Sequence, residues 1–168
     1  MSDVIDVPPL LAKLERDVAA LIRARNLINP AIVGIHTGGA WIAQHLHQAL
    51  GLTTALGRLD ISFYRDDFTR FGINPQVKPS DLPFSVDDRH ILLVDDVLFT
   101  GRTIRAALNE LFDYGRPASI ALVTLVDRGG RELPIQADAV GMHVTLARNE
   151  QVKLHGPTPL TMVKQKTG

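Results

Sequence analysis

Three apolar runs rich in β-branched side chains divide the chain and predict strands buried on both faces. These runs are 31–35, 91–94 and 119–126, and further strands are expected over 56–63 and 139–144. The first two runs lead into stretches with helical spacing of apolar residues. Strands that alternate with helices favour a parallel sheet. The prediction is therefore an α/β fold in a single domain over residues 1–168, with a central parallel sheet flanked by helices.

Apolar residues that recur every three or four positions predict three amphipathic helices. The first begins near Pro8, because proline suits the opening turn of a helix. The helix after 31–35 is expected to end at Gly51, and the helix after 91–94 at Gly115. Glycine commonly closes helices because it tolerates the left-handed conformation.

Three segments are predicted to lack regular structure. Residues 1–7 are expected to form a loose end. The sequence after Lys153 is expected to be irregular because of Pro157 and Pro159, with 164–168 frayed. Residues 64–84 are polar and contain three prolines. A connection of that length is either a functional lid or a disordered segment.

One stretch, 91–103, carries the clearest chemistry. Its strand is expected to end at two adjacent carboxylates, Asp95 and Asp96, and Thr100-Gly101-Arg102-Thr103 then opens a helix. Free N–H groups and the dipole at a helix start favour a phosphate. The carboxylates are poorly placed for that phosphate but well placed to accept hydrogen bonds from a vicinal diol. Together these features indicate a ribose 5-phosphate site, and the alternative is an acidic strand end before a threonine-capped helix.

This stretch resembles the phosphoribosyl-pyrophosphate (PRPP) signature of the type I phosphoribosyltransferases. Two further segments, Asp60-Ile-Ser-Phe-Tyr-Arg-Asp-Asp67 and Val126-Asp-Arg-Gly-Gly-Arg-Glu-Leu-Pro-Ile135, narrow the resemblance. They are similar to those of the pyrimidine operon attenuators that are also uracil phosphoribosyltransferases. The resemblance runs from about Leu10 to Lys153. It implies a PRPP-binding motif made of Ile91, Leu92, Leu93, Val94, Asp95, Asp96, Val97, Leu98, Phe99, Thr100, Gly101, Arg102 and Thr103.

The resemblance also implies roles for single residues. The expected catalytic residues are Asp95 and Asp96, which would hold the ribose hydroxyls, and Arg65, which would reach pyrophosphate from the start of a mobile lid loop over residues 65–80. For Arg65, a plain surface arginine is the alternative. The nucleobase pocket is expected to involve Val126, Asp127, Arg128 and Met142, largely through backbone groups, and Arg131 is interpreted as structural. No general base for the uracil N1 proton can be named.

The turn after the first strand looks like the pyrophosphate loop of this family. It consists of His36, Thr37, Gly38 and Gly39. Relatives often carry basic residues in this loop, whereas His36 and Gly38 stand here. Neutralisation of pyrophosphate would therefore depend more on Mg²⁺ and backbone N–H groups. His36 could equally be a surface histidine.

Composition excludes several classes of function. The chain has no cysteine, which excludes disulfides, thiolate metal sites and thiol catalysis. No apolar run approaches the ~20 residues of a membrane span, no signal peptide is apparent, and a cytoplasmic location is expected. The formal net charge is +0. Any RNA contact would need a local basic patch, and the candidates are Lys13, Arg16 and Arg23 on the first helix.

The implied ligands are PRPP, uracil and the uridine nucleotides UMP and UTP. Mg²⁺ is expected to be held mainly by substrate oxygens and water, without a closed metal site made by protein side chains. A homo-oligomer without membrane contact is expected, and a pyrimidine-operon leader mRNA is the candidate macromolecular partner. Three functions stay open: a uracil phosphoribosyltransferase that also regulates through RNA, a phosphoribosyltransferase for uracil or a purine without an RNA role, and a nucleotide-sensing RNA-binding regulator with vestigial catalysis.

Overall fold

A five-stranded parallel sheet forms the centre of the molecule, as the sequence predicts. The structure, a computed structural model, describes residues 3–61 and 80–168. The strand order is β3-β2-β4-β5-β6, and every neighbouring pair is parallel. The strands are β2 (Ala31–Ile35), β3 (Gly57–Leu59), β4 (His90–Leu98), β5 (Ser119–Asp127) and β6 (Ala139–His143).

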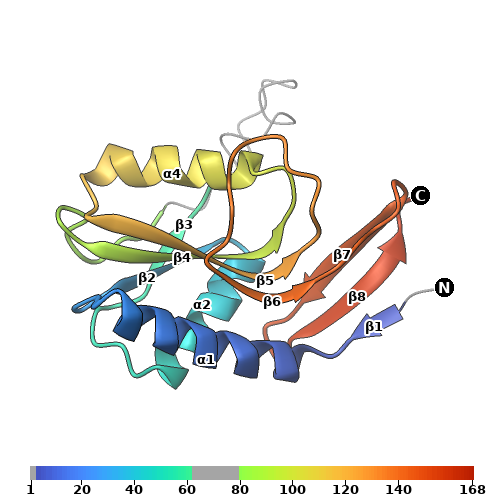
Figure 1. The fold of residues 1–168 in the computed structure, drawn as a ribbon, viewed down its shortest axis with the longest axis horizontal. Coiled ribbons are helices and arrows are strands. Elements are labelled where there is room, and N and C mark those ends of the chain that lie inside the picture. The colour runs from blue at the N-terminus through green and yellow to red at the C-terminus, as the bar shows by residue number, and fades with distance from the viewer. Residues whose placement is uncertain (1–2, 62–79) are drawn as a thin grey trace.

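Helices cover both faces of this sheet (Figure 1). Helices α1 (Val7–Ala24) and α2 (Gly38–Ala49) lie on one face, and α4 (Arg102–Tyr114) lies on the other. The apolar side chains of β4 alternate between the two faces. Leu92 packs into the cluster beneath α1 and α2, and Leu93 packs into the cluster beneath α4. The predicted helices and their glycine-marked ends are confirmed, since Leu50 caps α2 directly before Gly51 and Gly115 caps α4.

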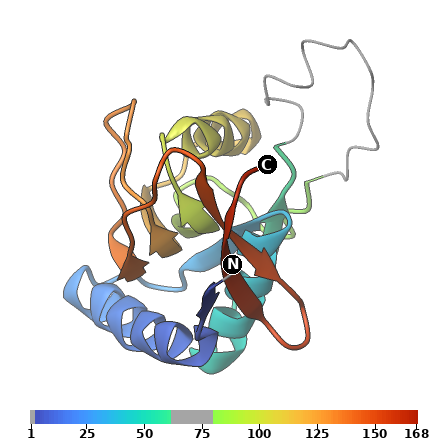
Figure 2. The same cartoon turned by 90° about the vertical axis from the view of Figure 1, so that its right-hand side faces the viewer.

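The two chain ends form a second, antiparallel sheet that the sequence did not predict. It contains β1 (Asp3–Ile5), β7 (Glu150–His155) and β8 (Thr161–Lys166) in the order β1-β8-β7. Figure 2 shows β1 beside the C-terminal hairpin. The predictions of a loose N-terminal end and an irregular C-terminal tail are therefore wrong. Pro157 and Pro159 fall in the hairpin connection rather than in its strands, so they do not oppose it.

The hairpin belongs to the main core. Leu154 of β7 and Met162 of β8 are buried, and both join the apolar cluster beneath α1 and α2. Trp41 of α2 packs against the hairpin connection, because a Cβ placed on Gly156 would lie 3.1 Å from its indole. No helix in the described parts of the chain is long and apolar enough to cross a bilayer.

Strand β4 continues beyond the acidic pair, contrary to the prediction that it ends there. Asp95 lies in register with Thr124 of β5, and Leu98 lies in register with Asp127. The longer strand is explained by this pairing with β5, which local sequence does not reveal. Strand β3 is shorter than the predicted 56–63, of which residues 62–63 lie outside the described residues, as do Arg65 and residues 65–79 of the expected lid.

Candidate active site

Three loops meet at the carboxyl edge of the central sheet, where open α/β sheets bind ligands. They follow the adjacent strands β2, β4 and β5 and comprise residues 36–39, 99–101 and 128–138. The parallel pairing brings these ends together although they are far apart in sequence. The structure thus unites the expected pyrophosphate loop, PRPP motif and nucleobase loop at one edge.

The pyrophosphate loop touches the acidic pair through its glycines. A Cβ on Gly38 would lie 2.5 Å from Oδ2 of Asp96, and a Cβ on Gly39 would lie 2.5 Å from the carbonyl oxygen of Val94. Any larger residue at either position would clash with these atoms, so the two glycines that mark the loop in the sequence are required for steric reasons. His36 is half-buried and its N–H donates to the carbonyl of Leu59, while the peptide bond from His36 to Thr37 is cis.

The two carboxylates differ in exposure. Asp95 is only 6% exposed and lies within β4 rather than at the strand end that the sequence predicts, and its Oδ1 accepts the backbone N–H of Asp96 at 2.9 Å. Asp96 is half-buried, and its Oδ1 accepts the N–H of Val97 at 2.9 Å. Asp96 is therefore the carboxylate with more access to a ligand, and Asp95 braces the backbone beneath it.

The phosphate-type helix start is present at α4. Gly101 caps the helix with φ of 96°, a conformation that glycine adopts without strain. Thr100 Oγ1 accepts the N–H of Arg102 at 3.2 Å, and Thr103 lies half-buried in the first turn. The first N–H groups of a helix have no partner within the helix, so they suit an anion.

Backbone N–H groups of the nucleobase loop donate to backbone carbonyls of the PRPP motif. The carbonyl of Leu98 accepts the N–H of Arg128 at 3.0 Å. The carbonyl of Thr100 accepts the N–H groups of Glu132 at 2.9 Å and Leu133 at 3.1 Å. These bonds hold the two loops side by side.

Asp127, at the end of β5, is a buried carboxylate held by charged and polar neighbours. Arg131 Nη2 donates to its Oδ2 at 2.6 Å, the N–H of Gly129 donates to its Oδ1 at 2.9 Å, and His143 Nδ1 lies 4.0 Å away. Burial alone would raise the pKa of Asp127, but the bonds from Arg131 and Gly129 outweigh it and hold the pKa below its usual value.

The remaining nucleobase candidates are placed differently from one another. The side chain of Val126 is buried in the core, so only its backbone is near the site edge, and Met142 is half-buried beside it in register. The Arg128 guanidinium lies over the Phe99 ring, 3.7 Å from its centroid. Nε of Arg128 is buried without a hydrogen-bond partner among the described residues.

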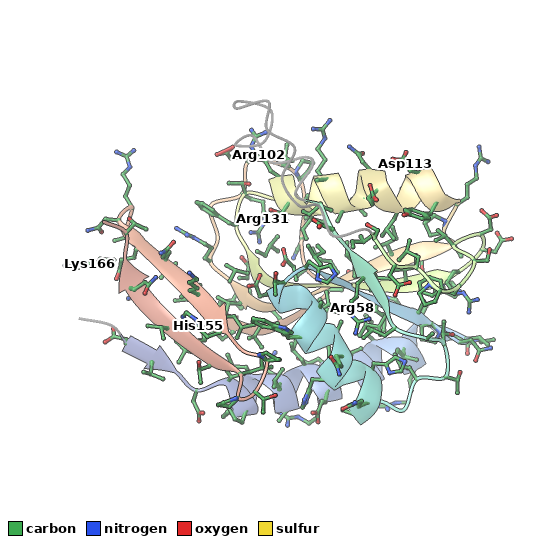
Figure 3. The ribbon with its side chains drawn as sticks, turned by 180° about the vertical axis from the view of Figure 1, so that it is seen from behind. Arg58, Arg102, Asp113, Arg131, His155 and Lys166 are labelled. Atoms are coloured by element: carbon green, nitrogen blue, oxygen red, sulfur yellow. The ribbon has the colours of Figure 1, made fainter. Side chains whose placement is uncertain are left out.

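Sequence reasoning interpreted Arg131 as structural without naming its partners, and it did not single out His143. Arg131 joins the loops through three contacts, and His143 faces Asp127 from β6. Figure 3 shows Arg131 beside Arg102 at this edge, away from His155 and Lys166 on the hairpin. The register between Asp127 and His143 depends on the pairing of β5 with β6, so no local pattern marks it.

The RNA candidates lie on α1. Lys13 Nζ is engaged at 2.7 Å with Asp17 Oδ2 and at 2.7 Å with the carbonyl of Val140. Arg16 and Arg23 are exposed, and within the described residues neither makes an ion pair. Only part of the expected patch is therefore free.

Comparison with known proteins agrees with this geometry. The family model described as phosphoribosyl transferase domain matches residues 4–155. A protein of Nitrosococcus oceani named "Bifunctional protein PyrR" is 68% identical over 133 residues, covering 78% of this chain and 75% of the relative. The protein of the same name from Pseudomonas paraeruginosa is 58% identical over 156 residues, covering 93% of this chain and 92% of the relative.

A solved structure shows the same fold. The hypoxanthine phosphoribosyltransferase of Trypanosoma cruzi superposes with a TM-score of 0.67 at 18% identity, covering 95% of this chain and 93% of that chain. At this identity the likeness concerns the fold alone. The family model and the extent of the close relatives together show that the chain belongs to the phosphoribosyltransferase family and, within it, to the PyrR family.

Proposed function

We propose that this protein transfers the phosphoribosyl group of PRPP to uracil, giving UMP and pyrophosphate, and that it also regulates pyrimidine genes through leader mRNA. The observation that carries the catalytic part is the contact of the glycine turn 36–39 with Asp96, next to the phosphate-type start of α4. A pyrophosphate, a ribose and a 5′-phosphate joined in one molecule need three such groups at one edge of the sheet. The PyrR family membership supports the same reaction.

The chain's own residues would act by binding and charge. N–H groups and threonine hydroxyls over 100–103 bind the 5′-phosphate, and Asp96 accepts hydrogen bonds from the ribose hydroxyls. The bond from C1 to the pyrophosphate oxygen breaks, the leaving group keeps the electron pair, and N1 of uracil forms the new bond as it loses its proton. The negative charge of Asp95 and Asp96 favours the cationic sugar that forms between these events.

Mg²⁺ fits the residues present at this edge. The carboxylate of Asp96 is a hard oxygen donor that faces the pyrophosphate loop. Mg²⁺ usually keeps several waters and is held by one or two carboxylates together with substrate phosphates. When bound, it would neutralise the charge of the departing pyrophosphate.

The catalytic proposal is tested with radiolabelled bases. Purified protein is incubated with PRPP, Mg²⁺ and labelled uracil, hypoxanthine or guanine, and labelled nucleotide is measured. We expect UMP from uracil and little product from purines. Product from a purine instead would favour a purine enzyme, and no product from any base would favour the regulator with vestigial catalysis.

RNA binding is the second function, and the exposed Arg16 and Arg23 on α1 favour a local site. Arg148, Lys153 and Arg116 are also exposed, but Arg116 follows α4, on the other face of the sheet from α1, and the guanidinium of Arg128 is already stacked on Phe99. Because RNA affinity depends on neutralised phosphates, a true site should weaken as salt rises.

A leader RNA from a pyrimidine operon is titrated across a salt series, with and without UMP. We expect a Lys13, Arg16, Arg23 triple-alanine variant to bind more weakly than the unaltered protein. Most of that loss should come from the two arginines, since Lys13 is engaged within the fold. If the leader binds no better than unrelated RNA in either condition, the enzyme-only function remains.

We further propose, on the basis of the PyrR family membership, that the protein forms a homo-oligomer and is cytoplasmic. Exposed apolar side chains of Phe112 and Tyr114 at the end of α4 provide a surface for association. Sedimentation of the purified protein at several concentrations tests the oligomer, and a monomer throughout would contradict it.

A further inference from the structure

Arg131 is the side chain through which the nucleobase loop holds the PRPP motif. Its Nη1 donates to the carbonyl of Phe99 at 2.7 Å, its Nη2 to Asp127 Oδ2 at 2.6 Å, and its Nε to the carbonyl of Ile135 at 2.8 Å. One guanidinium therefore joins the motif, the end of β5 and the far side of the nucleobase loop. Its side chain is 23% exposed; the bonds to Asp127 and Ile135 are partly buried, whereas the bond to Phe99 is exposed to solvent.

The hydrogen bond from Arg131 to the carbonyl of Phe99 completes a row of contacts between the PRPP motif and the nucleobase loop. The carbonyls of Leu98 and Thr100 accept backbone N–H groups from the nucleobase loop, and Phe99 between them accepts Arg131. All three consecutive carbonyls thus face that loop. At the start of α4 the N–H of Arg102 donates to Thr100 Oγ1, and the N–H groups that follow it in the first turn, which have no partner within the helix, are left for a phosphate.

The nucleobase loop also contacts the side chain of Phe99, which is 45% exposed, on one face and one edge of its ring. Arg128 covers the ring face at 3.7 Å, and a Cβ on Gly130 would lie 2.6 Å from the ring edge. Movement of the nucleobase loop would therefore move Phe99. Since Phe99 precedes Thr100 directly, it would also move the residues that open the phosphate site.

We propose that Arg131 is a positioning residue that couples the two loops, so that a base bound at one strengthens binding of the ribose phosphate at the other. This coupling rests on the proposed function for the identity of the two ligands. Arginine suits the role because its planar fork reaches three acceptors in fixed directions, which the single ammonium of lysine does not. If Arg131 had only a structural role, its substitution would change stability, but the affinity for one ligand would not depend on the presence of the other.

The coupling is measured without a chemical reaction. Ribose 5-phosphate is titrated into the full-length protein by calorimetry, with and without saturating uracil, and the ratio of the two dissociation constants is taken. We expect a ratio of at least about five in the unaltered protein, the lower end of usual coupling between sites. In Arg131→Gln the ratio should fall towards one, and Arg131→Lys should lie between.

A matched arginine provides the control. Arg25 Nη2 also pairs with an aspartate, Asp138 Oδ1, at 2.7 Å at the last residue of the nucleobase loop, but among the described residues it forms no ion pair with the PRPP motif or with residues 36–39. Arg25→Gln should keep the full ratio. A ratio near one in the unaltered protein, an unchanged ratio in Arg131→Gln, or an equal loss in Arg25→Gln would each overturn the proposal.

A pH series gives a second readout. The groups that face Asp127 are Arg131, His143 and the N–H of Gly129. Loss of Arg131 removes two of the causes that lower the pKa of Asp127 and leaves only Gly129 and His143 to oppose burial, so the coupling in Arg131→Lys should persist to lower pH than any residual coupling in Arg131→Gln. Turnover of the unaltered protein tests the proposed function separately, because the calorimetric ratio needs no catalysis.

Discussion

At the scale of single residues, the two carboxylates of the PRPP motif do different work. Asp95 is buried and accepts the N–H of Asp96, whereas Asp96 is half-buried and faces Gly38 of the pyrophosphate loop. Identical side chains at neighbouring positions therefore divide into a structural support and a ligand contact. Mutations at the two positions should differ accordingly.

Asp96→Asn should keep the fold and lower kcat/KM by on the order of 10²-fold, the usual effect of removing one well-placed electrostatic contact in an active site. Asp95→Asn should also lower kcat/KM, because it removes one of the two negative charges near the sugar, and it should in addition lower the melting temperature, because a buried group loses part of its hydrogen bonding. Steady-state kinetics and thermal unfolding of both variants check this. Unchanged turnover in Asp96→Asn would remove that residue from the site.

Asp127 makes stability depend on pH. Its pKa in the folded protein lies below the usual 3.8, so its charge stabilises the fold above that value. This contribution is lost as pH falls through the folded pKa. Asp127→Asn should therefore lower the melting temperature at pH 7 by a few degrees, since about 1 kcal/mol corresponds to ~2–4 °C in a protein of this size.

At pH values well below 3.8, the melting temperatures of Asp127→Asn and the unaltered protein should approach each other. The exposed Asp113 at the end of α4, labelled in Figure 3, provides the control. Asp113→Asn should leave the melting temperature nearly unchanged at both pH values. If the melting temperature of Asp127→Asn stays equally far below that of the unaltered protein in acid, the packing of this side chain rather than its charge stabilises the fold.

At the scale of elements, the C-terminal hairpin is part of the core. Met162 of β8 is fully buried in the cluster that also holds Leu92 and Val94 of β4. Met162→Ala should lower the free energy of unfolding by about 2–5 kcal/mol, because it removes apolar contacts and leaves a cavity. Chemical denaturation measures the loss.

The control for this substitution is Val4 of β1, whose residue is 78% exposed. Val4→Ala should change the free energy of unfolding by less than ~0.5 kcal/mol, as surface substitutions usually do. A small effect of Met162→Ala would mean that the hairpin docks loosely on the main sheet.

The elements that could be predicted from sequence are those set by local patterns. Apolar runs predicted the parallel strands, and helical spacing with Gly51 and Gly115 predicted the helices and their ends. The chemistry of Asp95 to Thr103 could also be predicted, because a strand, an acidic pair and a helix start follow one another directly. These features need no knowledge of distant contacts.

The features that were missed depend on contacts between distant segments. The alternation of Leu154 and Met162 with polar residues is short, and Pro157 and Pro159 between them favour an irregular tail until the pairing with β1 is known. The contacts of Arg131 could not be predicted because its partner Phe99 is brought close by the pairing of β4 with β5.

At the scale of the whole molecule, one apolar cluster joins both sheets. It contains residues of β4 and β5 together with Leu154 and Met162 of the antiparallel sheet. Sheets that share a core are expected to unfold together. The match of the family model to residues 4–155 is consistent with one unit that spans nearly all the chain.

The fluorescence of Trp41 can show whether the two sheets unfold together. This residue is the chain's single tryptophan, and it packs at the junction of α2 with the hairpin connection. Its fluorescence and the far-ultraviolet circular dichroism should therefore report the same midpoint in urea. An earlier midpoint by fluorescence would show that the antiparallel sheet detaches before the parallel sheet unfolds.

The pairing of β1 with β8 has a consequence for synthesis on the ribosome. Asp3 lies opposite Lys164, so the first strand to be translated receives its hydrogen-bonding partner only when the last strand has been made. Domains usually begin to fold from the N-terminal side as the chain emerges, at ~5–20 residues each second. The nascent chain can assemble α1 and the parallel strands during this time, while β1 waits with its backbone unpaired. Closure of the antiparallel sheet therefore comes after the strands of the parallel sheet have been made.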